Sequence, residues 1–245
     1  MTDAAAEGRP SQGRVVVVTG GNRGLGRELV RQCAARGDTV VLGSRRADAG
    51  ARAARELTPG TAAGGHVLPY RLDVTNPVGL AELREELRTE VGHVDVLINN
   101  AAVHYDTEQT SVHVDLAVVR EALETNLLGA WQTSLALLPL LRLSPSPRVV
   151  MVSSEGGSLT SMAGGAPAYS VSKAALNALT RTLAGDLHAA GVLVNAVCPG
   201  WTATDMGGPG GRPVAQGAAS VLWAVDLPDD GPTGTFTRDG RPLPW

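Results

Sequence analysis

The stretch that decides the fold is 14-RVVVVTGGNRGLG-26, in which a run of valines leads directly into a glycine-rich turn. The β-branched run predicts a buried strand, and the apolar spacing of residues 24–36 predicts a helix directly after the turn. Glycine lets the chain reverse sharply here and lets backbone approach a pyrophosphate without a Cβ in the way. The N-terminus of the next helix suits such an anion. Many glycine-rich turns are only tight turns, but the order strand, turn, helix favours a dinucleotide site.

The same alternation of strands and helices continues along the chain. Apolar runs predict strands at 14–19, 39–43, 67–72, 94–98, 148–153 and 192–197, and three- and four-residue apolar spacing predicts helices at 24–36, 47–57, 77–91, 115–141 and 169–190. Apolar strands separated by helices indicate a parallel sheet that is covered on both faces. We therefore expect a flexible tail at residues 1–13 and one α/β domain at 14–245 with a Rossmann-type, doubly wound parallel sheet. The Gly/Pro stretch 207–213 is a candidate mobile lid.

The composition excludes several classes of protein. Of the 245 residues, 43% are hydrophobic and 18% are charged, which is enough to bury a sizeable core. The net charge of −3 with scattered arginines offers no basic face for nucleic acid. The apolar runs are too short for a bilayer, the first residues do not form a signal peptide, and no metal-ligand spacing occurs. We expect a cytoplasmic protein that binds no nucleic acid, membrane or metal, with Cys33 and Cys198 as buried thiols.

The end of the second predicted strand bears on which dinucleotide is bound. A fold that binds NAD offers an acidic residue to the ribose about twenty residues after the glycine turn. Here the chain reads GSRR at 43–46, with no acid before Asp48. Arg23, Arg45 and Arg46 could surround a 2′-phosphate instead, because the planar guanidinium fork suits that group. The pattern favours NADP(H), with a solvated arginine pair as the alternative.

A second group of residues predicts acid–base chemistry. Lys173 is the only lysine of the chain, and it follows Tyr169 by four residues on a predicted helix, so the two side chains share a face. A cation within about 4–6 Å favours the phenolate, so we expect a lowered pKa for Tyr169. An ordinary helix-face pair is the alternative. Ser153 and Ser154 end a predicted strand, where neighbours point to opposite faces, so only one of them can face a substrate.

Seven motifs that occur in order carry a family resemblance. They are TGGNRGLG (19–26), LDV (72–74), NNAA (99–102), ETNLLGA (124–130), VSS (152–154), YSVSK (169–173) and CPGWTATDM (198–206). Together they resemble the short-chain dehydrogenase/reductase family, and most closely its NADP-preferring, carbonyl-reductase-like members. The resemblance implies hydride transfer between NADP(H) and a small-molecule carbonyl or secondary alcohol.

The resemblance also implies a role for each residue of a catalytic set. Tyr169 is the general acid and base, and Lys173 also binds the nicotinamide ribose. Ser154, the second serine, hydrogen-bonds the substrate oxygen. Asn126 holds a water that links Lys173 to solvent, with a purely structural asparagine as the alternative.

The residues expected to contact the cofactor or the substrate are spread along the whole chain. The cofactor-binding residues expected are Gly20, Asn22, Arg23, Gly24, Leu25, Gly26, Ser44, Arg45, Arg46, Asp73, Val74, Asn99, Ala101, Tyr169, Lys173, Pro199, Gly200, Thr202 and Thr204. The substrate-pocket residues expected are Ser154, His104, Met162, Trp201 and Met206.

The sequence leaves two alternative functions open and suggests one form of self-association. The same scaffold can serve an isomerase or dehydratase, and a non-enzymatic NADPH-sensing protein would bind the cofactor alone. Helices 115–141 and 169–190 are candidates for pairing across a homodimer. The last residues, GTFTRDGRPLPW, depart from the ending through which many members of the family form tetramers.

Overall fold

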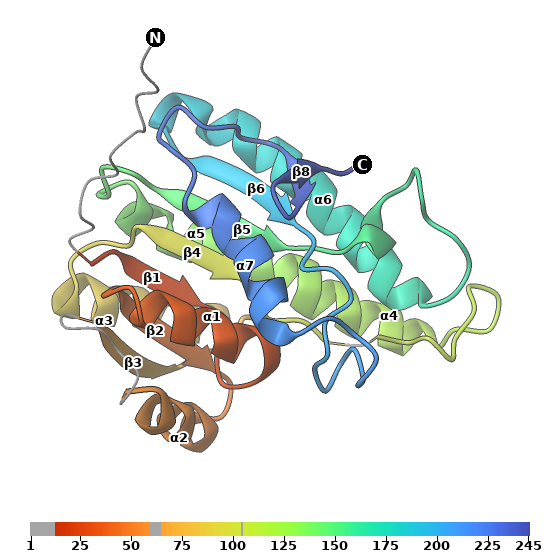
Figure 1. Cartoon of the computed structure of the whole chain (residues 1–245), viewed down its shortest axis with the longest axis horizontal. Helices are drawn as coiled ribbons and strands as arrows, with labels where there is room; N and C mark the ends of the chain where they lie inside the picture. Colours follow the sequence, from red (N-terminus) through yellow and green to blue (C-terminus); the bar gives the residue numbers. More distant parts are fainter. Residues whose placement is uncertain (1–12, 59–64, 104) are drawn as a thin grey trace, which may run out of the picture.

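The computed structural model describes residues 13–58, 65–103 and 105–245, and its centre is an eight-stranded sheet (Figure 1). The strand order is β3-β2-β1-β4-β5-β6-β7-β8, in which every neighbouring pair is parallel except β7 with β8. The strands are β1 (Val15–Val18), β2 (Thr39–Ser44), β3 (His66–Arg71), β4 (Val96–Asn99), β5 (Arg148–Val152), β6 (Leu193–Val197), β7 (Phe236–Arg238) and β8 (Arg241–Pro242). The predicted doubly wound parallel sheet is confirmed.

Helices cover both faces of the sheet (Figure 1). They are α1 (Gly24–Ala34), α2 (Ala47–Leu57), α3 (Pro77–Glu90), α4 (Leu116–Ala122), α5 (Ala130–Leu141), α6 (Pro167–Leu187) and α7 (Val214–Val225). A π-helical segment, η2 (Leu123–Gly129), joins α4 to α5, and short 3₁₀ turns form at η3 (Glu155–Gly157) and η4 (His188–Ala190). Within the described part of the chain, none of these helices has the length and apolar character that crossing a bilayer requires.

The alternation of side chains along β1 divides the core into two. Val15 and Val17 pack on one face of the sheet with side chains of α3, α5 and α6. Val16 and Val18 pack on the other face with side chains of α1, α2 and α7. Four consecutive valines are therefore all buried, because successive residues of a strand point to opposite faces and both faces are covered.

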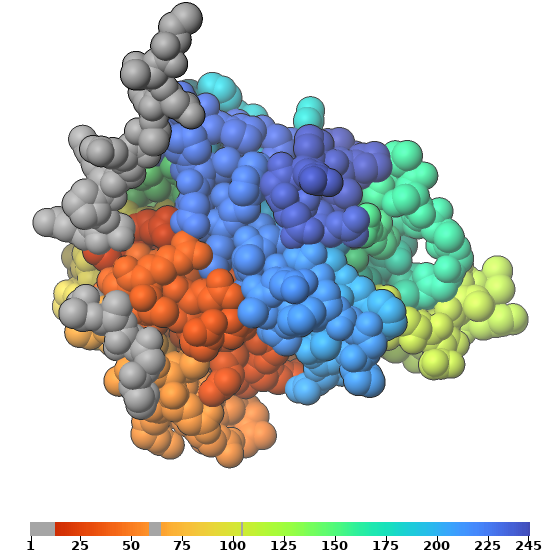
Figure 2. All heavy atoms as spheres, viewed as in Figure 1, coloured from red at the N-terminus to blue at the C-terminus, as the bar shows by residue number. Residues whose placement is uncertain are grey.

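Helix α7 was not predicted from the sequence. It packs beside α1, and Figure 2 shows the blue surface of this part of the chain lying against the red-orange surface of α1. Seven of its twelve residues are buried, around more than one side of the helix. An amphipathic period is weak in a helix that is covered on several sides, which is why the spacing did not reveal it. Strands β7 and β8, of three and two residues, are too short to show a period.

The sheet topology places the carboxyl ends of the strands at one edge. The chain runs outward from β1 through β2 to β3, and then returns to build β4, β5 and β6 on the other side of β1. The crevice between the carboxyl ends of β1 and β4 is therefore a topological switch point, where open α/β sheets bind ligands. The glycine turn follows β1 there, and the serine pair follows β5.

Candidate active site

The glycine turn after β1 has the geometry that its sequence predicts. Gly20 and Gly24 have φ angles of +65° and +52°, in the left-handed region that favours glycine. A Cβ on Gly26 would lie 2.2 Å from the carbonyl oxygen of Gly20, so only glycine fits where α1 meets the turn. Helix α1 has no side-chain cap and no acidic residue in its first turn, so its N-terminal N–H groups are not used by a side chain there. These features fit the pyrophosphate of a dinucleotide.

Asn100, which the sequence reasoning missed, holds this turn against β4. Its Nδ2 donates to the carbonyl oxygens of Thr19 (2.8 Å) and Gly20 (3.3 Å). In return, Oγ1 of Thr19 accepts hydrogen bonds from the N–H groups of Asn100 and Ala101, both at 2.9 Å. The second asparagine of the NNAA motif was the available signal.

The three arginines predicted to surround a 2′-phosphate differ in their partners. Arg23 lies 3.4 Å from Asp205 and Arg46 lies 2.6 Å from Asp48, with all four side chains exposed. Arg45 is exposed as well, and it forms no ion pair or hydrogen bond with any residue that the structure describes. Arg45 therefore has the guanidinium that is most available to a phosphate.

The other predicted cofactor residues surround the same edge of the sheet, and several already have protein partners. Asp73 Oδ1 accepts from the N–H (3.0 Å) and the hydroxyl (2.8 Å) of Thr75. Val74 is buried against Gly129, which leaves only its backbone for a ligand. Asn99 is buried and donates to Ser134 Oγ (3.0 Å), while its Oδ1 has no partner among the described atoms.

The loop after β6 reaches the glycine turn. A Cβ on Gly24 would lie 3.5 Å from the side chain of Thr204, so the two segments are adjacent. Gly200 has a φ of +72°, and Thr202 donates its hydroxyl proton to the Gly200 carbonyl (3.0 Å). Pro199, Gly200, Thr202 and Thr204 lie on this segment, which the contact between Gly24 and Thr204 brings against the glycine turn.

Three polar residues of helix α6 lie at four-residue spacing on one face. Tyr169, Lys173 and Asn177 follow one another along this face, which packs on the end of β5. Lys173 is buried and donates from Nζ to the carbonyl oxygen of Val152 at 2.8 Å. Its Nζ lies 5.6 Å from the centre of the Tyr169 ring. The structure therefore brings the predicted pair together.

The pKa values of this pair move in the direction that burial dictates. Burial raises the pKa of Tyr169 to about 12, although a hydrogen bond with Ser154 acts in the opposite direction. Burial likewise lowers the pKa of Lys173 to about 8. The lowered pKa that the sequence predicts for Tyr169 is therefore wrong for the protein alone, because desolvation outweighs any effect of the nearby amine. The phenol is protonated at neutral pH.

The two serines after β5 point to different places. Ser153 is buried and donates its hydroxyl proton to Oδ1 of Asn177 at 2.6 Å. Ser154 lines the cavity above α6 together with Tyr169, and its Oγ accepts from the N–H of Gly156 at 3.1 Å. A Cβ on Gly157 would lie 2.6 Å from the backbone of Lys173, so this glycine lets the turn after Ser154 sit directly on α6. Asn177 and Gly157 were not found from the sequence, because their partners lie far away along the chain.

Asn126 lies in the π-helical segment η2, and its side chain is fully used. Its Oδ1 accepts from the N–H of Val103 (2.8 Å), and its Nδ2 donates to the Val103 carbonyl (3.0 Å) and to Ser172 Oγ (2.9 Å). These bonds tie the loop after β4 to α6. Asn126 therefore has a structural role, and the water-holding role that the family resemblance implies stays a prediction.

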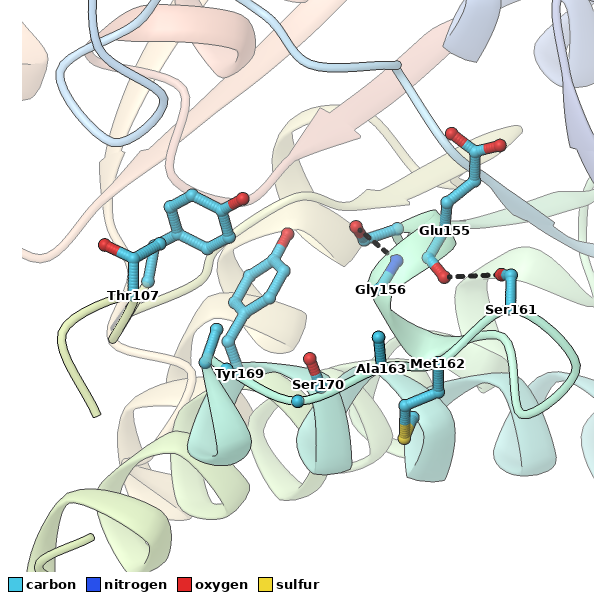
Figure 3. A pocket seen from close by; sticks show the side chains of 13 residues that line it. Thr107, Glu155, Gly156, Ser161, Met162, Ala163, Tyr169 and Ser170 are labelled. Carbon is cyan, nitrogen blue, oxygen red and sulfur yellow. Dashed lines mark hydrogen bonds between the residues drawn. The ribbon is translucent and has the colours of Figure 1, made fainter. Parts of the chain in front are cut away.

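A cavity of about 550 Å³ opens above Tyr169. Figure 3 shows the phenol rising from α6 into it, with Thr107 on one side and Glu155, Gly156 and Ser161 on the other. The cavity is lined by Tyr105, Thr107, Ser154, Glu155, Gly156, Tyr169, Ser170 and the segment 161–166. Most of that segment is alanine and glycine, so the side chains along this wall of the cavity are small, and none of them is charged.

The residues predicted for a substrate pocket lie at different places relative to this cavity. The structure places Ser154 and Met162 in the cavity lining, and His104 lies outside the described residues. Trp201 and Met206 do not line it. The indole of Trp201 donates to the Gly207 carbonyl (2.7 Å), which turns the ring along its own exposed loop. Tyr105 was missed, and its ring meets that of Tyr169 edge-on with centres 5.1 Å apart.

Neither a disulfide bond nor a cluster of metal-ligating side chains occurs among the residues that the structure describes. Cys33 and Cys198 are free and buried. No group of three or more His, Cys, Asp or Glu side chains is placed to hold a metal ion within the residues described.

Comparisons with known proteins agree with this geometry. The profile of the family described as short chain dehydrogenase matches residues 14–212. The chain is 33% identical to short-chain dehydrogenase/reductase 1 of Saponaria officinalis, over 96% of this chain and 97% of that protein. It is 31% identical to carbonyl reductase (NADPH) 1 of Mus musculus, over 94% and 98%. Its fold superimposes on NADPH-bound carbonyl reductase from chicken fatty liver with a TM-score of 0.85, at 25% identity, over 96% and 100%.

Proposed function

The chain belongs to the short-chain dehydrogenase family, and on that premise we propose that it is a reductase that transfers hydride between NADP(H) and a carbonyl or secondary alcohol. One observation carries the proposal. The phenol of Tyr169 stands in the cavity that Ser154 also lines, 5.6 Å from Lys173 Nζ as measured to the centre of its ring. A proton donor with a second hydroxyl beside it suits a carbonyl oxygen that gains negative charge, and a buried amine lies close to that donor.

The mechanism follows from where each side chain lies. The nicotinamide supplies or accepts the hydride when the cofactor is bound. Ser154 and Tyr169 both present hydroxyl groups to the cavity, so a carbonyl oxygen placed between them accepts two hydrogen bonds. These bonds strengthen as negative charge develops on that oxygen, which stabilises the transition state. Tyr169, with its pKa raised to about 12, holds its proton until the oxygen becomes more basic than the phenolate.

The geometry also supports a reason why this position holds a lysine. The ammonium reaches the Val152 carbonyl at 2.8 Å from inside the protein core and still has two donors for other partners. A planar guanidinium is wider, and it cannot lose its charge as Lys173 does near pH 8. The ribose hydroxyls of the cofactor are the partners that we propose for the remaining donors.

The choice of NADP(H) rests on Arg45. Its exposed guanidinium directly follows β2, which ends at Ser44, where the adenosine ribose lies in this kind of fold. Both the murine relative and the avian structure carry NADPH in their names, which supports the same cofactor here. Asp48, the nearest acid, is paired with Arg46 and does not offer a free carboxylate to an NAD ribose.

The two alternative functions predict different behaviour in one assay. We expect the purified protein to consume NADPH, followed by its absorbance, with ketones or aldehydes from a panel of uncharged compounds. Tyr169→Phe should abolish this turnover and leave NADPH affinity within about threefold, because only the transferable proton is lost. Tight NADPH binding without turnover of any carbonyl would favour the sensor, and conversion of a substrate without net change in NADPH would favour an isomerase or dehydratase.

We further propose a homodimer formed through the helices that the sequence indicates. Leu128, Trp131 and Leu135 lie at three- and four-residue spacing on η2 and α5, and all three are exposed, as is Val171 on α6. Light scattering on the native protein and on Trp131→Glu tests this. A monomer in both samples would contradict it.

A further inference from the structure

The helix that carries Tyr169 begins without a cap of its own. Ala166, the residue before α6, has no polar side chain and adopts a left-handed backbone with a φ of +44°. Pro167 starts the helix and has no N–H group. The first donors that need a partner are therefore the N–H groups of Ala168 and Tyr169 itself.

Asp106 supplies both partners from a distant loop. Its Oδ2 accepts from the N–H of Ala168 at 3.0 Å, and its Oδ1 accepts from the N–H of Tyr169 at 3.1 Å. Asp106 belongs to the loop between β4 and α4, more than sixty residues earlier in the chain, which reaches the beginning of α6 in Figure 1. A carboxylate also complements the positive end of the helix dipole.

Val103, which belongs to the same loop, is also linked to α6. The backbone of Val103 is held at both its N–H and its carbonyl by Asn126, as described above. Asn126 also donates to Ser172 Oγ, and Ser172 in turn donates to the carbonyl oxygen of Tyr169 at 2.7 Å. Both backbone groups of Tyr169 are therefore linked to the loop between β4 and α4. Its N–H is bonded to Asp106, and its carbonyl is linked to Val103 through Ser172 and Asn126. The ring of Tyr105, from the same loop, meets the ring of Tyr169 edge-on.

We propose that Asp106 is a positioning residue, which fixes the backbone and hence the phenol of Tyr169 in the cavity. The inference rests on the proposed function, in which Tyr169 donates the proton. The hydroxyl stands at the far end of a rigid side chain, so a small rotation of the first turn of α6 moves it by a large fraction of an ångström. A displacement of about 1 Å in a reacting group costs about 100-fold in rate.

The experiment compares Asp106→Ala with a matched loss of a helix cap elsewhere. Asp115 caps α4 by accepting from the N–H of Ala117 (2.8 Å) and does not touch Tyr169, so Asp115→Ala is the control. We expect Asp106→Ala to lower kcat by about 10- to 100-fold, with KM and the Kd for NADPH within about threefold. Asp106→Asn, which keeps one acceptor oxygen, should recover part of the lost kcat. Asp115→Ala should leave kcat within about twofold.

A second readout does not depend on activity. Hydrogen exchange of a peptide spanning residues 166–172 should become faster in Asp106→Ala and stay unchanged in Asp115→Ala, because only the first variant frees the two amides of α6. Unchanged kcat and exchange in Asp106→Ala would overturn the inference. So would equal losses of kcat in the two alanine variants, or a loss of NADPH affinity that parallels the loss of kcat.

The two proposals fail in different ways. If Tyr169→Phe retains turnover, the proposed function is wrong and Asp106 has no proton donor to position. If Tyr169→Phe is inactive while Asp106→Ala has normal kcat, the proposed function stands and only the positioning role is lost.

Discussion

The buried amine of Lys173 makes the stability of the protein depend on pH in a way that one substitution can isolate. Burial disfavours the charged form, so it lowers the pKa of Lys173 from the ordinary value of 10.5 to about 8 in the folded protein. Between these values the unfolded chain holds a proton that the folded protein does not. Stability therefore rises with pH across this window, by about 1.4 kcal/mol per unit where the difference is complete.

The magnitude follows from the same two values. From pH 7 to pH 10 the free energy of unfolding should rise by about 2 to 3 kcal/mol on account of Lys173 alone. In Lys173→Met this rise should be absent. The two proteins need not differ in stability at pH 7, because the variant avoids the cost of burying an amine but loses the hydrogen bond to the Val152 carbonyl. The test is therefore the slope with pH and not the stability at one pH.

Urea unfolding of the cofactor-free proteins at pH 7, 8, 9 and 10 measures this slope. Tyr169 has a raised pKa and acts in the opposite direction, since it lowers stability as the pH rises past its ordinary value of 10. This effect of Tyr169 lies above pH 10, so the difference between the two proteins from pH 7 to pH 10 reports mainly on Lys173. Parallel pH curves for wild type and Lys173→Met would refute the conclusion that burial governs the charge of this amine.

Four further substitutions test the site and the segments that support it. Ser154→Ala should lower kcat by about 10²- to 10³-fold, because it removes one donor to the developing oxyanion. Ser153→Ala should lower kcat much less, because the Ser153 hydroxyl is bonded to Asn177. The opposite order in steady-state kinetics would mean that the wrong serine is assigned. Arg45→Ala should weaken NADPH by roughly 10- to 150-fold and leave NADH nearly unchanged, and equal losses in a fluorescence titration would contradict the preference for NADP(H). Ala166→Gly should raise the free energy of unfolding in urea by about 0.5 to 1 kcal/mol, because its backbone is left-handed, and a loss of stability would contradict that strain.

The sequence was sufficient for those features that depend on near neighbours in the chain. A run of valines followed by glycines predicts β1, the turn and α1, since strand and turn preferences are local. Four-residue spacing predicts that Tyr169 and Lys173 share a helix face, and strand alternation predicts that Ser153 and Ser154 diverge. The choice of Ser154 came from the family resemblance, and the structure places that hydroxyl in the cavity.

The remaining features depend on packing between segments that are distant in the chain. The raised pKa of Tyr169 depends on how deeply the folded protein buries it, which a four-residue spacing does not reveal. Asp106 reaches Tyr169 across 63 positions, a pairing that no local pattern specifies. Trp201 was expected in the pocket but bonds to its own loop. The periodicity of apolar residues indicates which side of a helix or strand is buried. Which other segment buries that side is decided only when the whole chain folds. That partner then determines the charge state and the hydrogen bonds of the buried side chains.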